Sequence, residues 1–187
     1  MEGGSPTFTG CAFNGNKAPA GYGGGFYNSG GKPTLTNCLF EGNETLMAGG
    51  GLYSAGSTSP GTTLVGCSFT NNTASSGAGV ALVPLDIGTP PQIRTVATLT
   101  GCTFRDNHRP SLGSGEGGGL ALKESDATVT DCNFISNTSS KGGGIAVGSE
   151  SSATIERCDF TTNAAGNGGG MYVVGDSSAS LVDCTFA

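Results

Sequence analysis

The chain has 187 residues, of which 35% are hydrophobic, 35 are glycine and none is tryptophan, so a conventional globular core is poorly supplied. The net charge of −6 and the lack of a basic stripe argue against nucleic acid as a partner, because phosphates need cationic contacts. No stretch approaches the roughly 20 apolar residues that span a bilayer, so we expect no membrane insertion by this segment.

A repeat unit of about 26 residues runs through the whole sequence. Its clearest mark is the motif C-x-F-x-x-N, which six units carry complete and a seventh begins. The cysteines are Cys11, Cys38, Cys67, Cys102, Cys132, Cys158 and Cys184. An apolar residue stands three positions before each cysteine, and a glycine cluster such as "GGGFY" or "GGGIAV" follows each asparagine. A fixed period of this length predicts a solenoid in which coils stack on one another.

The second unit shows how one coil is expected to fold. Alternation places Leu35 inside the coil between two outward threonines. A bend near Asn37 resets the alternation, so Cys38 and Phe40 also point inward. Asn43 then closes a corner, and the glycines lead into the next inward set. Each motif position therefore builds one ladder along the core, made of cysteine, phenylalanine or asparagine.

Two repeat folds can carry the first half of this unit, a leucine-rich repeat and a parallel β-helix. The second half separates them, because a leucine-rich repeat continues after its asparagine with a convex and often helical segment. Here segments such as "TSSKGGG" follow instead. Three glycines are costly inside a helix but suit a tight bend with positive φ and closely approaching backbones. The sequence thus predicts an all-β fold, a parallel β-helix of about six complete coils.

The motifs F-x-x-N and G-G-G followed by Phe, Leu, Ile or Met resemble the repeats of the polymorphic outer membrane proteins. These chlamydial-type autotransporter adhesins are built on F-x-x-N and G-G-A-I. The resemblance covers nearly the whole chain. It implies a right-handed coil of three short strands that serves at a cell surface for adhesion or as a stalk.

We expect residues 1–187 to form a single β-helix domain that is a piece of a longer chain, since the pattern starts near Met1 and stops within a unit at Ala187. The expected location is extracellular or at the cell surface. Expected partners are the remainder of the parent chain and a glycan or a cell-surface protein. End-to-end self-association is also expected, because open ends of a β-helix expose unpaired strand edges.

An insertion at residues 84–95 makes the third unit the longest and contains Pro90-Pro91. Solenoids often place recognition in such loops, although a tolerated neutral insertion is the simpler interpretation of the extra length. A second variable loop, "HRPSLGSGE", lies in the next unit and is expected to flank the first. The predicted partner contacts are Asp86, Ile87, Gln92, Arg94, Arg105, His108 and Arg109.

Two other functions stay open from the sequence. A carbohydrate-active enzyme would need paired carboxylates from adjacent coils, and the only histidine lies in a cluster with Asp106 and Arg109. The simpler interpretation of this cluster is a solvated loop, so we assign no catalytic residue, cofactor or metal ligand. Alternatively, outward threonine pairs such as Thr34 and Thr36 form a Thr-x-Thr face that would suit ice or a regular glycan.

The cysteines and the glycosylation motifs have structural interpretations. One thiol per coil is typical of a small buried hydrophobic residue, although neighbouring coils bring Cα atoms within disulfide range and seven is an odd number. Asn43 and Asn137 belong to glycosylation motifs but occupy the inward ladder. Asn71 lies one position off the ladder and is the acceptable acceptor in a secretory route.

Asp126, Glu150 and Asp176 fall in comparable loops after the glycine strand of three consecutive units. Stacked carboxylates of this kind could bind a hard cation such as Ca²⁺. The loops lack a regular D-x-D pattern, so ordinary polar turn chemistry is the simpler interpretation.

Overall fold

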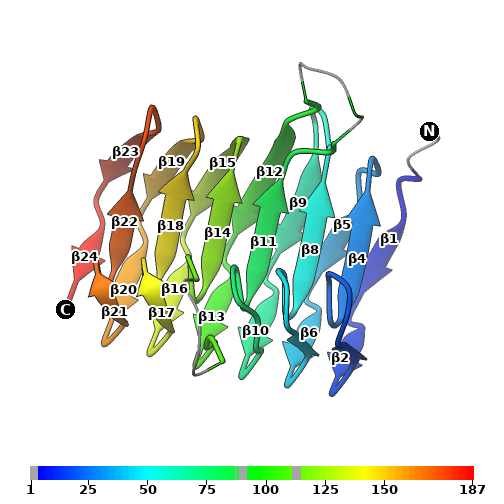
Figure 1. Cartoon of the computed structure of the whole chain (residues 1–187), viewed down its shortest axis with the longest axis horizontal. Coiled ribbons are helices and arrows are strands. Elements are labelled where there is room, and N and C mark those ends of the chain that lie inside the picture. The colour runs from blue at the N-terminus through cyan, green and yellow to red at the C-terminus, as the bar shows by residue number, and fades with distance from the viewer. Residues whose placement is uncertain (1–3, 87, 89–91, 111–114) are drawn as a thin grey trace.

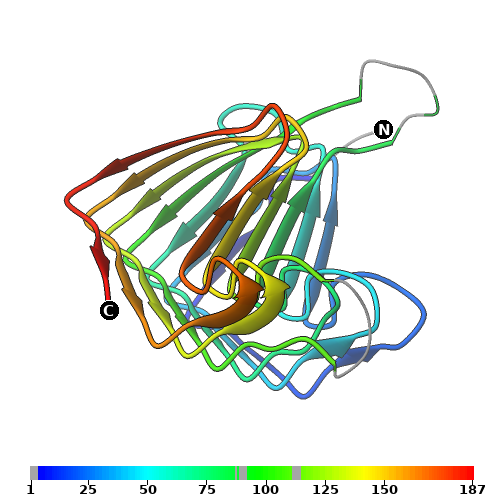
Figure 2. The same cartoon turned by 60° about the vertical axis from the view of Figure 1, so that its left-hand side comes forward.

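The computed structural model describes residues 4–86, 88, 92–110 and 115–187. Every regular element in it is a short β-strand, so it contains no helix that could cross a membrane. Three parallel sheets run along the molecule and enclose one core (Figure 1). Figure 2 shows the coils obliquely from the C-terminal end, with the sheets forming the sides of the solenoid.

The first two sheets contain seven strands each. The first sheet consists of β1 (Thr7–Thr9), β5 (Thr34–Thr36), β9 (Thr62–Val65), β12 (Thr95–Thr100), β15 (Ser125–Thr130), β19 (Ser152–Glu156) and β23 (Ser178–Val182). The second sheet consists of β2 (Ala12–Asn14), β6 (Leu39–Glu41), β10 (Ser68–Thr70), β13 (Thr103–Arg105), β16 (Asn133–Ile135), β20 (Asp159–Thr161) and β24 (Thr185–Phe186).

The third sheet has six strands and follows the glycine clusters. It consists of β4 (Phe26–Ser29), β8 (Leu52–Ala55), β11 (Val80–Val83), β14 (Leu120–Lys123), β18 (Ile145–Gly148) and β22 (Met171–Val173). Two small pairs complete the fold, β3 (Lys17–Ala18) with β7 (Glu44–Thr45) and β17 (Thr138–Lys141) with β21 (Ala164–Asn167). The chain visits the three sheets in turn and pairs each coil with the next, which confirms the predicted parallel β-helix.

The phenylalanine ladder fills the core beside the second sheet. Neighbouring rings stack face to face with centroids 4.4 to 5.0 Å apart. The rings belong to Phe13, Phe40, Phe69, Phe104, Phe134, Phe160 and Phe186. Parallel register puts identical residues one strand spacing apart, and that spacing equals the distance at which aromatic rings pack well. The inward phenylalanines are confirmed.

The asparagine ladder closes the corner after the second sheet. Asn107 is fully buried and illustrates the pattern. Its Nδ2 donates to the Phe69 carbonyl at 2.8 Å and to Asn137 Oδ1 at 2.9 Å. Its Oδ1 accepts from the backbone N–H and the Nδ2 of Asn72. Every side-chain donor and acceptor is therefore satisfied, as a buried polar group requires.

The glycine clusters form the bend that precedes the third sheet. Gly117 adopts a φ of 68°. A Cβ on Gly118 would lie 2.5 Å from the Gly143 carbonyl oxygen and 2.8 Å from the Thr138 nitrogen. A Cβ on Gly119 would likewise lie 2.7 Å from the Gly144 oxygen. Both expected reasons for the triple glycine, positive φ and close approach of backbones, are thus confirmed.

All seven cysteines are free thiols, and the five interior ones are buried. Burial raises the pKa of the Cys38 thiol, as expected for a group in apolar surroundings. The Sγ of Cys132 accepts a hydrogen bond from the Cys102 N–H at 3.3 Å, so the row packs coil on coil. The cysteines thus act as small core residues.

Candidate functional site

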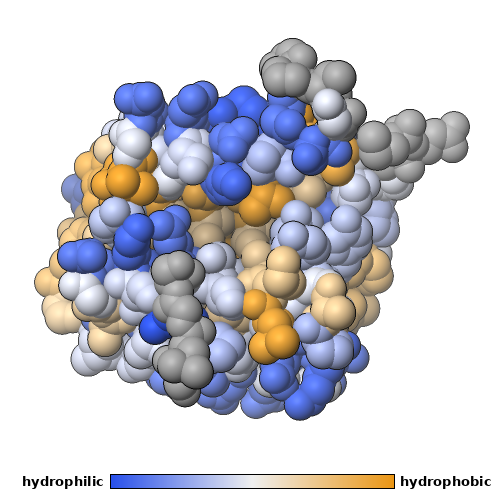
Figure 3. Space-filling view, in the orientation of Figure 1, coloured by the Kyte–Doolittle hydropathy of each residue, from blue (hydrophilic) through white to orange (hydrophobic). Residues whose placement is uncertain are grey.

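The outer face of the third sheet carries the most distinctive surface of the molecule. In each strand of this sheet, the residue after the first apolar residue points outward. These residues pair in register from strand to strand and form one row: Tyr27, Tyr53, Ala81, Ala121, Ala146 and Tyr172. Three small residues thus lie between tyrosines. The resulting floor is low in the middle and aromatic at both ends. Figure 3 shows this face, with a hollow that has an apolar floor and a hydrophilic rim above it.

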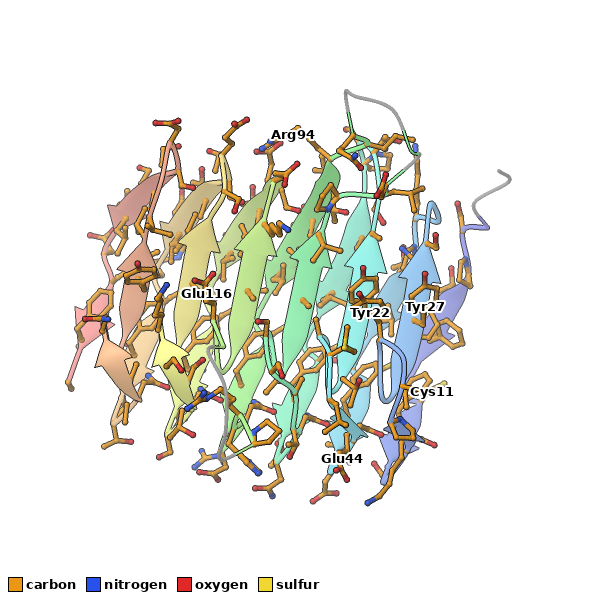
Figure 4. The ribbon with its side chains drawn as sticks, viewed as in Figure 1. Cys11, Tyr22, Tyr27, Glu44, Arg94 and Glu116 are labelled. Atoms are coloured by element: carbon orange, nitrogen blue, oxygen red, sulfur yellow. The ribbon has the colours of Figure 1, made fainter. Side chains whose placement is uncertain are left out.

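One rim of this groove lies where the strands begin. It contains Ala48, Ser76 and Glu116, which precede the glycine bends of three successive coils. Glu116 forms an ion pair with Lys141 at 3.1 Å, and the Lys141 ammonium lies 5.4 Å from the centre of the Tyr172 ring. The ion pair therefore joins Glu116 on this rim, labelled in Figure 4, to the tyrosine at the far end of the floor.

The other rim lies where the strands end and includes the insertion. Asp86 and Gln92 from the insertion line the groove, together with Lys123 and Glu124 at the end of β14. Between the rims is a pocket of about 460 Å³ above Tyr53, Ala81 and Ala121. This volume falls within the range of small-molecule and oligomer sites in proteins.

Stacked tyrosines close one end of the groove. Tyr53 is 9% exposed and lies between Tyr22 and Tyr27, with ring centroids 4.6 and 5.3 Å away. Burial raises the pKa of Tyr53 to about 12, and the neighbouring tyrosines add to the shift, so the phenol stays protonated. Tyr22 and Tyr27 are 42% and 52% exposed. The stack therefore presents aromatic surface to solvent (Figure 4).

The insertion is anchored to the sheet rather than suspended from it. Leu85 and Ile93 exchange both backbone hydrogen bonds as an antiparallel pair. The Leu85 side chain packs against the cluster formed by Tyr53, Ala55 and Ala81. Thr95, which was predicted to end the insertion, instead begins β12 and is fully buried. Its hydroxyl donates to the Val83 carbonyl, which ties the start of β12 to the end of β11.

The structure separates the predicted partner contacts into three places. Asp86 and Gln92 line the groove, while Ile87, Pro90 and Pro91 lie outside the described residues. Arg94 turns away and binds the Asp126 carboxylate through two nitrogens, at 2.7 and 3.1 Å. This carboxylate raises the pKa of Arg94.

The remaining predicted contacts lie near the corner that follows β13. Arg105 is exposed on that strand. His108 Nε2 lies 3.1 Å from the Thr73 hydroxyl, and its Nδ1 lies 3.2 Å from the Asp106 carbonyl. The described part of the second variable loop does reach the groove, through Glu116. That any of these residues contacts a partner stays a prediction.

The three acidic residues considered for a cation do not form one stack. Ser152 pairs with Ser178, so Glu150 and Asp176 occupy equivalent positions, but Asp126 does not join them. Asp126 lies within β15 and pairs with Ser152, so it is out of step with Glu150. Asp126 is displaced because the turn before it is short: only Glu124 separates β14 from β15. In the next unit residues 149–151 separate β18 from β19. Within the described part of the chain, no group of three His, Cys, Asp or Glu side chains could hold a metal.

The outer face of the first sheet carries an unbroken row of hydroxyl residues, in register as Thr7, Thr34, Thr63, Thr98, Thr128, Thr154 and Ser180. The neighbouring row is interrupted by Val65, Glu156 and Val182, as the sequence indicates. Ice or glycan binding by this face stays a prediction. Of the three glycosylation motifs, only Asn71 is exposed.

Comparison with known proteins supports the architecture. The model of the family described as "Right handed beta helix region" matches residues 2–187. The chain belongs to the right-handed β-helix family. No curated protein and no solved structure matched in the other two comparisons. This β-helix therefore has an assigned fold family, whereas the resemblance to polymorphic outer membrane proteins stays a prediction.

Sequence reasoning missed the tyrosine stack and the groove floor. The sequence did contain a signal for the floor. In the segments that follow the glycine clusters, the residue after the first apolar residue is Tyr, Tyr, Ala, Ala, Ala and Tyr in chain order. Tyr22 carried no such signal, since it lies in the loop before the glycines and not in a repeat position.

Proposed function

We propose that this β-helix is a non-catalytic binding segment of a secreted or cell-surface protein and that its groove holds an extended glycan. The observation that carries the proposal is the groove floor, where stacked tyrosines adjoin a run of alanines over a pocket of about 460 Å³. Exposed aromatic faces pack well against the C–H faces of sugar rings. Small floor residues leave room for a chain to lie flat along the sheet.

The solenoid supports an adhesive role in a second way. Its stacked coils form a rod, and a rod holds a binding surface at a distance from the structure to which it is attached. Surface display and adhesion are also what the resemblance to polymorphic outer membrane proteins implies. We therefore propose that the parent protein uses this segment as an adhesive stalk.

The test is a binding screen on glycan arrays and on cell surfaces. A variant with residues 86–92 replaced by Asn-Gly removes the insertion's contribution to the rim. It keeps the antiparallel pair of Leu85 and Ile93 and connects them by a two-residue turn, for which Asn-Gly is a favoured sequence. A second variant, Tyr53→Ala, removes the centre of the aromatic stack. Binding that both changes weaken supports the proposal, whereas binding that neither change affects excludes the groove as the site.

A glycan-cleaving enzyme is the second candidate. It is favoured by one observation, that three carboxylates, Asp86, Glu116 and Glu124, line the same pocket. Glycoside hydrolysis requires two carboxyl groups on opposite sides of the bond that breaks. Incubation with polysaccharides, followed by mass spectrometry of the products, distinguishes the two candidates. Cleavage that is lost in Glu116→Gln would favour the enzyme.

A further inference from the structure

The charges around the groove are unequal. Asp86, Glu116 and Glu124 line it against one cation, Lys123. Glu116 is compensated by its ion pair with Lys141, which lies at the end of the rim. Asp86 has no ion pair with any described residue. The rim formed by the insertion therefore presents an uncompensated negative charge to whatever occupies the groove.

Asp86 is held ready to accept further hydrogen bonds. The Gly88 N–H and Gln92 Nε2 donate to its Oδ1, at 2.7 and 3.2 Å. The Gly88 N–H, followed by Gln92, lowers the pKa of Asp86, so the carboxylate is ionised at neutral pH. Its Oδ2 has no partner among the described residues. Gln92 Oε1 beside it is a buried acceptor that also lacks a described partner.

Gln92 Oε1 is buried out of a ligand's reach, whereas Asp86 is exposed, so Asp86 Oδ2 is the acceptor that calls for a ligand rich in donors. An ammonium group supplies three. The exposed tyrosines at the end of the groove favour the same charge, because aromatic faces attract cations. A basic peptide is the less suitable occupant. The floor is the face of a paired sheet, whose backbone groups already bond to neighbouring strands and offer nothing to an added strand.

We propose that the groove ligand is a glycan of amino sugars that carry free ammonium groups, with one ammonium bound by the Asp86 carboxylate and sugar rings packed on the tyrosines. This inference rests on the proposed glycan-binding function and names its ligand class.

The experiment compares three soluble probes of equal length by titration calorimetry at low salt. The probes are oligomers of β-1,4-linked glucosamine, of its N-acetylated form and of glucose. Acetylation removes the charge and keeps the chain, so it isolates the ammonium. Asp86→Asn removes the proposed counter-charge. Asp106→Asn is the matched control, since Asp106 is exposed and lies at the corner after β13, outside the pocket lining.

We expect the glucosamine oligomer to bind about tenfold more tightly than the other two. Asp86→Asn should weaken it about threefold to fivefold, in line with a partly exposed ion pair. Asp106→Asn should leave it unchanged, and high salt should reduce the preference. Thermal unfolding of each variant checks that the fold is retained.

Three results would overturn the inference. If the three oligomers bind equally, the ammonium plays no part, but the glycan-binding function stands. If no oligomer binds, the proposed function fails together with the inference. If oligolysine binds as tightly as the glucosamine oligomer and shows the same dependence on Asp86, charge alone explains the site and the ligand is not specifically a glycan.

Discussion

Replacing Asn107 with alanine tests the asparagine ladder most directly. The substitution removes four hydrogen bonds that link three coils, two donated by Nδ2 and two accepted by Oδ1. Some partners keep a second bond. Asn72 Nδ2 still donates to the Phe40 carbonyl, and Asn137 Oδ1 still accepts from the residue 107 backbone N–H. The Asn72 backbone N–H loses its acceptor completely.

The expected cost follows from this bond count. A buried polar group left without a partner costs about 1–3 kcal/mol. The lost bonds that are partly compensated cost about 0.5–1.5 kcal/mol each. Because the positions lie on neighbouring coils and can relax together, we expect a total loss of about 3–5 kcal/mol in the free energy of unfolding.

Urea unfolding followed by circular dichroism measures this loss. The matched control is Asn71→Gly, which removes an exposed asparagine side chain one residue from the ladder. Its φ of 54° suits glycine, so we expect a change within about 0.5 kcal/mol. Hydrogen exchange should show that the Asn107 variant opens first in the coils that contain residues 72, 107 and 137. A loss below about 1 kcal/mol, relative to the control, would contradict the ladder as a source of stability.

Four further outcomes are expected. Phe134→Ala should cost about 3–5 kcal/mol in urea unfolding because the ring is fully buried, and a loss below about 1 kcal/mol would place it outside the core. Gly118→Ala should cost about 3 kcal/mol through its clash with the next coil. Gly101→Ala, at a positive φ of 62° that Gly118 does not share but with nothing within 4 Å, should cost only about 1 kcal/mol from backbone strain, and equal losses would refute the close-approach argument. In a secretory eukaryotic host, mass spectrometry should find glycan on Asn71 alone among the three motifs. We also propose that open ends pair between molecules, so charged capping coils should abolish any oligomer seen by light scattering, and an unchanged oligomer would exclude edge pairing.

The core could be predicted from the sequence because every coil places the same residue types at the same inward positions. An inward residue contacts the same residue type in the coils above and below, so one motif fixes a whole ladder. Leu35, Phe40 and Asn43 were placed correctly from one unit, and the other units follow by register. The change of phase at Asn37 was also correct, since its φ of 51° provides the bend.

The groove could not be predicted in the same way, because it depends on residues that do not repeat. Its rims are loops of unequal length, and only their folded position shows that Asp86 and Glu116 line one pocket. The interpretation of Asp126 and Glu150 as equivalent was wrong for a related reason. That interpretation counted residues from the strand that follows the glycines and assumed turns of equal length. The turn between β14 and β15 is shorter than the turn between β18 and β19.

The same division explains where a function can reside in this fold. Inward positions are fixed by the neighbouring coils, so they leave little freedom for recognition. The outward row of the third sheet is free to vary, and it changes from tyrosine to alanine and back to tyrosine. Tyr53 and Tyr172 are four strand spacings apart, or about 19 Å. A ligand that contacts both must therefore be an extended chain, which a single sugar ring or a small metabolite cannot be.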